Sequence, residues 1–84
     1  MSTAFRLVGY DKASEHIAVQ HEIPYRHSGA AKNIAGIGSV DDADLGDCEL
    51  GASQADFMGR LIHQSVDTRR FDYFLEPYVG GLAD

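Results

Sequence analysis

The sequence predicts a small α+β domain in which a three-stranded antiparallel or mixed sheet carries two helices packed on one face. Three observations support this fold: an alternating apolar segment before Pro24, two segments with apolar residues at helical spacing, and an aromatic segment near residues 71–79. Each helix has one apolar face, so packing both against one side of the sheet buries them most simply. The expected order is β-β-α-α-β.

The first two strands are expected to form a hairpin over residues 5–10 and 17–23. Side chains of the second segment are expected to alternate between the two faces of the strand. One face carries Ile17, Val19, His21 and Ile23, and the opposite face carries His16, Ala18, Gln20 and Glu22. Asp11 begins a polar turn that its carboxylate can cap, and Pro24 ends the second strand because it lacks a backbone donor.

The first helix is expected to run from Ser28, as N-cap, to about Ile37. Ala30, Ala31, Ile34 and Ile37 share one face, and the run Gly36-Ile37-Gly38 stops the helix. The second helix is expected to begin at Ser53, with Asp56 as its capping partner. Its predicted buried stripe is Phe57, Met58, Leu61, Ile62 and Val66, and Asp56 is expected to pair with Arg60.

The closing strand, residues 71–79, is predicted to turn Phe71, Tyr73 and Leu75 towards the helices. Phe74 and Tyr78 are then left on the uncovered face of the sheet. Exposed aromatic side chains are enriched at protein interfaces. No linker composition divides the chain, so residues 1–84 are expected to form one domain, with a short flexible tail at about 80–84.

Composition excludes several classes of function. The 84 residues carry 13 acidic and seven basic side chains, a net charge of −6, and no basic stripe that would bind nucleic acid. No apolar run is long enough to span a membrane, and the first residues do not resemble a signal peptide. The lone Cys48 favours a reducing compartment, so we expect a cytoplasmic protein.

The segment 41–49 concentrates acidic side chains: Asp41, Asp42, Asp44, Asp47 and Glu49. Calcium and magnesium prefer such oxygen ligands, but the EF-hand template fails here. With Gly46 at its glycine position, Ala43 and Leu45 occupy ligand positions. We therefore expect a solvated loop, with no metal and no cofactor.

Cys48 is the one candidate nucleophile, a few residues before the second helix. Nucleophilic catalysis needs a nearby base, and the sequence places none of the four histidines beside this thiol. Its three acidic neighbours would disfavour the thiolate. The expectation is no catalytic residue and no enzyme activity; the alternative is a small-ligand or metal-binding protein, or a minor enzyme, centred on Cys48 and the acidic loop 41–49.

Three segments carry a family resemblance: Tyr10-Asp11-Lys12, Leu45-Gly46-Asp47-Cys48-Glu49-Leu50 and Asp72-Tyr73-Phe74-Leu75-Glu76. Together they resemble a small bacterial family of unknown function, in which a hairpin precedes a helix and a closing aromatic strand. The resemblance implies no activity and no functional residues.

These features favour a non-enzymatic protein–protein interaction module. Its partner is another protein or a second copy of the chain; an inhibitor or immunity-type protein that neutralises a basic partner is the sharpest version. The candidate binding residues are Phe74, Tyr78, Asp41, Asp42, Asp44, Asp47 and Glu49.

Overall fold

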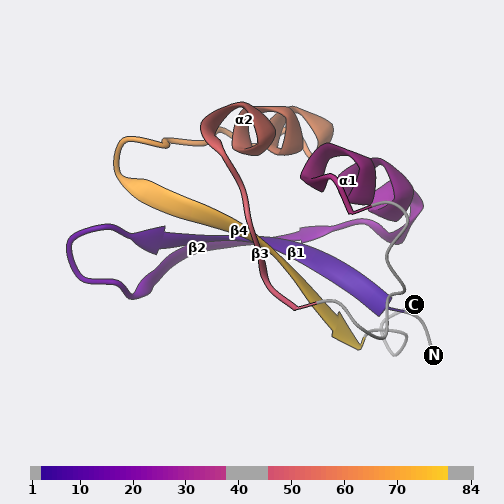
Figure 1. The fold of residues 1–84 in the computed structure, drawn as a ribbon, viewed down its shortest axis with the longest axis horizontal. Helices are drawn as coiled ribbons and strands as arrows, with labels where there is room; N and C mark the ends of the chain where they lie inside the picture. Colours follow the sequence, from indigo (N-terminus) through magenta and orange to yellow (C-terminus); the bar gives the residue numbers. More distant parts are fainter. Residues whose placement is uncertain (1–2, 38–45, 80–84) are drawn as a thin grey trace.

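A computed structural model describes residues 3–37 and 46–79 of the chain. Its elements are β1 (Thr3–Asp11), β2 (Ile17–Ile23), the 3-10 helix η1 (Tyr25–His27), α1 (Ser28–Ala35), β3 (Cys48–Glu49), α2 (Ala52–Leu61) and β4 (Phe71–Val79). The strands form one antiparallel sheet in the order β2-β1-β4-β3. Both helices lie on the same side of this sheet (Figure 1). We call the other side, which no helix of the described residues covers, the open face.

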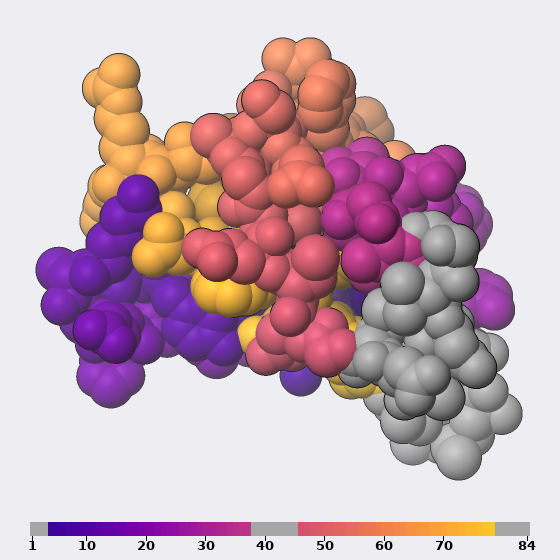
Figure 2. All heavy atoms as spheres, viewed as in Figure 1, coloured from indigo at the N-terminus to yellow at the C-terminus, as the bar shows by residue number. Residues whose placement is uncertain are grey.

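The α+β class and the two helices on one face are confirmed, but the count of three strands is wrong. The additional strand is β3, which pairs Cys48 with Leu75 and Glu49 with Phe74 at the edge of the sheet. It lies in the segment predicted to be an acidic loop. A strand of two residues has no alternation to reveal it, so only pairing with β4 defines it. Figure 2 shows this segment crossing the front of the molecule on its way to α2.

The hairpin of β1 and β2 is confirmed, and local hydrogen bonds explain its turn. The Asp11 carboxylate accepts hydrogen bonds from the backbone N–H groups of Ala13 and Ser14, at 2.8 and 3.2 Å. These bonds lower the pKa of Asp11 below its usual value of 3.8. Glu15 completes the turn in the left-handed region, with φ 62°. Pro24 follows β2 directly, as predicted.

The predicted helix starts are wrong by a residue or more. Ser28 lies inside α1, which continues from η1, and its buried hydroxyl has no hydrogen-bond partner among the described residues. At α2 the N-cap is Gly51, whose N–H donates to Gln54 Oε1 at 2.7 Å, so Ser53 lies within the helix. The predicted stop of α1 is confirmed at Gly36, which adopts φ 77°, a conformation that glycine reaches without strain.

The core lies between the helices and the sheet. Its buried members are Phe5, Leu7, Ile23, Ala31, Ala35, Leu50, Ala55, Met58, Tyr73 and Leu75. Leu7 and Leu75 face each other across the central strands and are fully buried. The helices contribute small side chains together with Met58, so they approach the sheet closely.

The position of Phe57 contradicts the predicted buried stripe of α2. Its side chain is 55% exposed, whereas Ala55, Met58 and Gly59 are buried and Leu61, Ile62 and Val66 pack partly against the core. The buried face of α2 therefore includes two small residues, Ala55 and Gly59, which were not part of the predicted stripe of larger apolar side chains. The predicted pair of Asp56 and Arg60 is confirmed, at 3.1 Å. Among residues 3–37 and 46–79, no helix is long and apolar enough to cross a membrane; the predicted tail, 80–84, lies outside the described residues.

Neighbouring positions on α2 should respond very differently to truncation. Met58→Ala removes a fully buried side chain and should lower the free energy of unfolding by about 2–5 kcal/mol. Phe57→Ala removes an exposed ring and should change it by about 0.5 kcal/mol or less. Urea unfolding followed by circular dichroism measures both. Equal losses would contradict the placement of the two side chains.

Candidate functional site

The open face is built by the alternation of β1 and β4. Arg6 and Val8 on β1 lie opposite Glu76 and Phe74 on β4. Val8 is fully buried although no described helix lies on this side. The larger side chains around it therefore form a closed layer over the sheet, and that layer is the surface which the open face presents.

Tyr10 and Glu76 form the centre of that layer. The Tyr10 hydroxyl donates a hydrogen bond of 2.8 Å to Glu76 Oε2, and Arg6 Nε lies 3.8 Å from Glu76 Oε1. The rings of Tyr10 and Phe74 meet edge to face, with centroids 5.4 Å apart. The side chain of Glu76 is only 12% exposed. The Glu76 carboxylate thus holds the Tyr10 ring directly, and the Tyr10 ring in turn packs against Phe74.

Tyr78 is held in the same way at the other end of the open face. Its hydroxyl donates a hydrogen bond of 2.8 Å to Glu22 Oε1 on β2, and the Arg6 guanidinium lies over its ring, 4.7 Å from the centroid. Both tyrosine pKa values are raised above 10.0, mainly because each hydroxyl donates to a carboxylate. The phenols therefore stay protonated and ordered across the physiological range.

A concavity of about 410 Å³ adjoins the aromatic pair, near the hairpin turn. It is lined by Tyr10, Asp11, Lys12, Glu15, Asp47, Asp72 and Phe74. Four carboxylates face one ammonium group there, and Lys12 Nζ lies 3.7 Å from Asp72 Oδ1. The concavity therefore combines negative charge with two aromatic rings. A cationic side chain is the chemical group that suits both.

The structure brings some of the predicted binding residues together and separates others. Asp47 lines the same concavity as Phe74, and Glu49 pairs with Phe74 across β3 and β4. Tyr78 lies four residues further along β4, about 13 Å away. The remaining three, Asp41, Asp42 and Asp44, lie outside the described residues.

Cys48 is half-buried against the helix layer. Its thiol lies 3.9 Å from the carbonyl oxygen of Ala35 and 3.8 Å from that of Glu49. β3 and β2 are the two edges of the sheet, so Cys48 and His21 are about 14 Å apart across it. No group of three His, Cys, Asp or Glu side chains in residues 3–37 and 46–79 could hold a metal ion.

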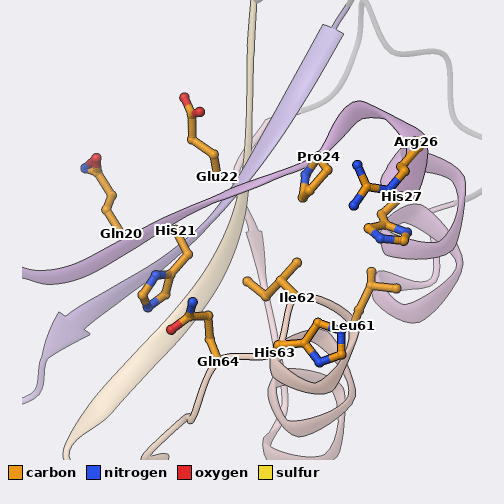
Figure 3. A pocket seen from close by; sticks show the side chains of 10 residues that line it. All are labelled: Gln20, His21, Glu22, Pro24, Arg26, His27, Leu61, Ile62, His63 and Gln64. Atoms are coloured by element: carbon orange, nitrogen blue, oxygen red, sulfur yellow. The ribbon is translucent and has the colours of Figure 1, made fainter.

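Three histidines that sequence analysis left apart line a second concavity, of about 380 Å³, which we call the histidine pocket (Figure 3). His21 comes from β2, His27 from η1, and His63 from the turn after α2. They are separated by five and 35 intervening residues, so no motif spacing links them. The position of α2 brings His63 to the pocket that His21 and His27 also line.

The comparisons with known proteins give one finding. Residues 4–76 match the family described as "Domain of unknown function (DUF7683)". Neither the curated proteins nor the solved structures contain a match to the chain. The matched region runs from the second residue of β1 to Glu76 in β4, and it includes all the elements between them.

The two tyrosine–carboxylate bonds can be tested separately. Glu76→Gln removes the charge that favours the protonated Tyr10 phenol and should lower the pKa of Tyr10, while Tyr78 stays unchanged. Glu22→Gln should do the reverse. The ¹³Cζ shifts of both tyrosines, followed by NMR between pH 8 and 12, give the result.

The same bonds should also make stability depend on pH in the alkaline range. A phenol whose pKa is raised on folding stabilises the fold below its unfolded pKa, and this contribution disappears as pH rises through the folded value. Wild-type stability should therefore fall above pH 10, and Glu76→Gln should reduce that fall. Identical alkaline profiles for the two proteins would contradict this role of the Tyr10–Glu76 bond.

Proposed function

The chain belongs to the DUF7683 family, and we propose that it is a non-enzymatic protein-binding module whose open face docks a protein with a basic surface. One observation carries the proposal: an ordered layer of aromatic rings and carboxylates lies on the side of the sheet that no described helix covers. Binding of a partner to this layer should lose little side-chain entropy, because the side chains already hold fixed positions.

The aromatic groups supply the anchors of the proposed interface. Phe74 and Tyr78 are partly exposed, and each is immobilised by a neighbour on β1 or β2. Rigid aromatic side chains contribute most to binding when a partner covers them, since they lose little entropy and bury a large area. The layer therefore offers two anchors about 13 Å apart along one strand.

The charges on the open face favour a basic partner. Its acidic side chains are Glu22, Asp47, Glu49, Asp72 and Glu76, against Arg6 and Lys12. Arg6 and Lys12 both lie beside carboxylates, so their charge is already offset. A lysine or arginine of the partner fits the acidic concavity beside Tyr10 and Phe74. The most specific form of this proposal is that the chain is an inhibitor or immunity-type protein, which neutralises a basic partner.

A second copy of the chain is the competing occupant. The net charge of −6 opposes pairing of two acidic open faces, because like charges would meet. Sedimentation of the purified protein distinguishes the two occupants. A monomer at micromolar concentration supports a different protein as partner, while a dimer that Phe74→Ala dissociates would replace the basic partner with a second copy.

The experiment that identifies the partner uses a photoreactive phenylalanine analogue at position 74 or 78, expressed in the cells that produce the protein. Position 57 is the matched control, because Phe57 is exposed on the helix side. We expect one basic protein to crosslink from positions 74 and 78, and not from 57. Equal crosslinking from all three positions, or an acidic crosslinked protein, would contradict the proposal.

Affinity measurements with the purified partner then test the two halves of the surface. Phe74→Ala should weaken binding about tenfold or more, as expected for an anchor residue. Asp72→Asn should weaken it less, and chiefly at low salt, because exposed charges act through a screened field. Binding that is unaffected by both substitutions would place the interface elsewhere.

A further inference from the structure

The histidine pocket lies on the helix side of the sheet, away from the open face. Figure 3 shows His21 and Gln64 at one end, Arg26 and His27 at the other, and His63 between them. Gln20 and Glu22 point to the far side of β2. The polar side chains that face the pocket are thus rich in N–H donors.

Among the described residues, no carboxylate pairs with these donors. The Glu22 carboxylate accepts from Tyr78 on the open face, so it is turned away from the pocket. Within residues 3–37 and 46–79, no hydrogen bond or ion pair engages the side chains of Arg26, His21, His27 or His63. An always-charged guanidinium with three imidazoles makes this a local site for negative charge in an acidic chain.

His63 adds an independent observation. It has φ 58°, in the left-handed region, and lies at the turn that ends α2. In this turn the N–H of Gln64 donates to the carbonyl oxygen of Gly59 at 2.8 Å. Glycine is the usual residue here because it adopts this conformation without strain. A histidine at this position adopts the left-handed conformation less readily than glycine, but it places an imidazole at the pocket.

We propose that the histidine pocket binds a small phosphate monoester. The Arg26 guanidinium and the imidazoles of His27 and His63 would donate to the phosphate oxygens, and the apolar side chains of Pro24, Leu61 and Ile62 would contact the organic group. A volume of about 380 Å³ exceeds that of a bare phosphate and is in the usual range for small-molecule pockets.

The direction of the donors favours phosphate over carboxylate. Arg26 and His27 come from η1 and His63 from the turn after α2, so the donors approach from two separate sides of the pocket. Oxygens of a tetrahedral phosphate point in such divergent directions, whereas both oxygens of a carboxylate lie in one plane and suit a single guanidinium.

Phenyl phosphate is a suitable probe, with benzoate, inorganic phosphate and benzyl alcohol for comparison. Titrated into ¹⁵N-labelled full-length protein at constant ionic strength, phenyl phosphate should give saturable shifts at His21, Arg26 and His63. Benzoate and inorganic phosphate should bind more weakly, and benzyl alcohol should give no saturable shifts. Tighter binding of benzoate than of phenyl phosphate would overturn the choice of phosphate.

Substitutions then test the donors. Arg26→Gln should weaken phenyl phosphate binding roughly tenfold or more, since it removes a charge-assisted bond. Arg69→Gln is the matched control: it makes the same change of charge at an exposed position outside the pocket and should leave binding unchanged. Equal effects of the two substitutions would mean that the anion responds only to overall charge, and would overturn the site.

His63→Gly separates binding from folding. Glycine relieves the left-handed backbone, so the thermal midpoint should stay the same or rise, while binding should weaken roughly two- to tenfold. A structural role alone would leave binding intact. Undiminished binding in His63→Gly, or the absence of saturable shifts in the wild type, would overturn the proposal without touching that of the open face.

Discussion

The structure depends on the pairing of its first and last strands. β1 and β4 pair over nine successive residues at the centre of the sheet, from Thr3–Val79 to Asp11–Phe71. This register places Leu7 against Leu75 on the helix side and Arg6 against Glu76 on the open side. A shift of one residue would exchange the two faces and expose the core leucines. One ladder therefore fixes both the packing of the helices and the surface opposite them.

The two faces of the sheet also differ in charge. The open face gathers carboxylates around aromatic rings, and the histidine pocket gathers nitrogen donors at the edge beyond β2. This separation of charge follows from the alternation of side chains along β2. The Glu22 carboxylate points to Tyr78 on the open face, while the neighbouring His21 faces the pocket. A chain with a net charge of −6 thus keeps a site of opposite character on its helix side.

Periodicity in the sequence was enough to predict the hairpin, the two helices and the inward side of β4. It failed where tertiary contacts decide: β3 forms because β4 is beside it, and the core face of α2 is set by Ala55 and Gly59 rather than by Phe57. The same limit applies to the sites. Alternation in β4 pointed to Phe74 and Tyr78, but the presence of His63 in one pocket with His21 and His27 depends on the position of α2, which local spacing does not record.

The central position of β4 has a consequence for the order of folding. The β1–β2 hairpin needs only local contacts, yet an isolated hairpin is marginally stable in water. Leu7 pairs with His21 in this hairpin, but its apolar neighbour Leu75 comes from residues 71–79. We therefore expect the sheet to become stable only when β4 inserts between β1 and the short edge strand β3, a pairing between distant parts of the sequence that slows folding.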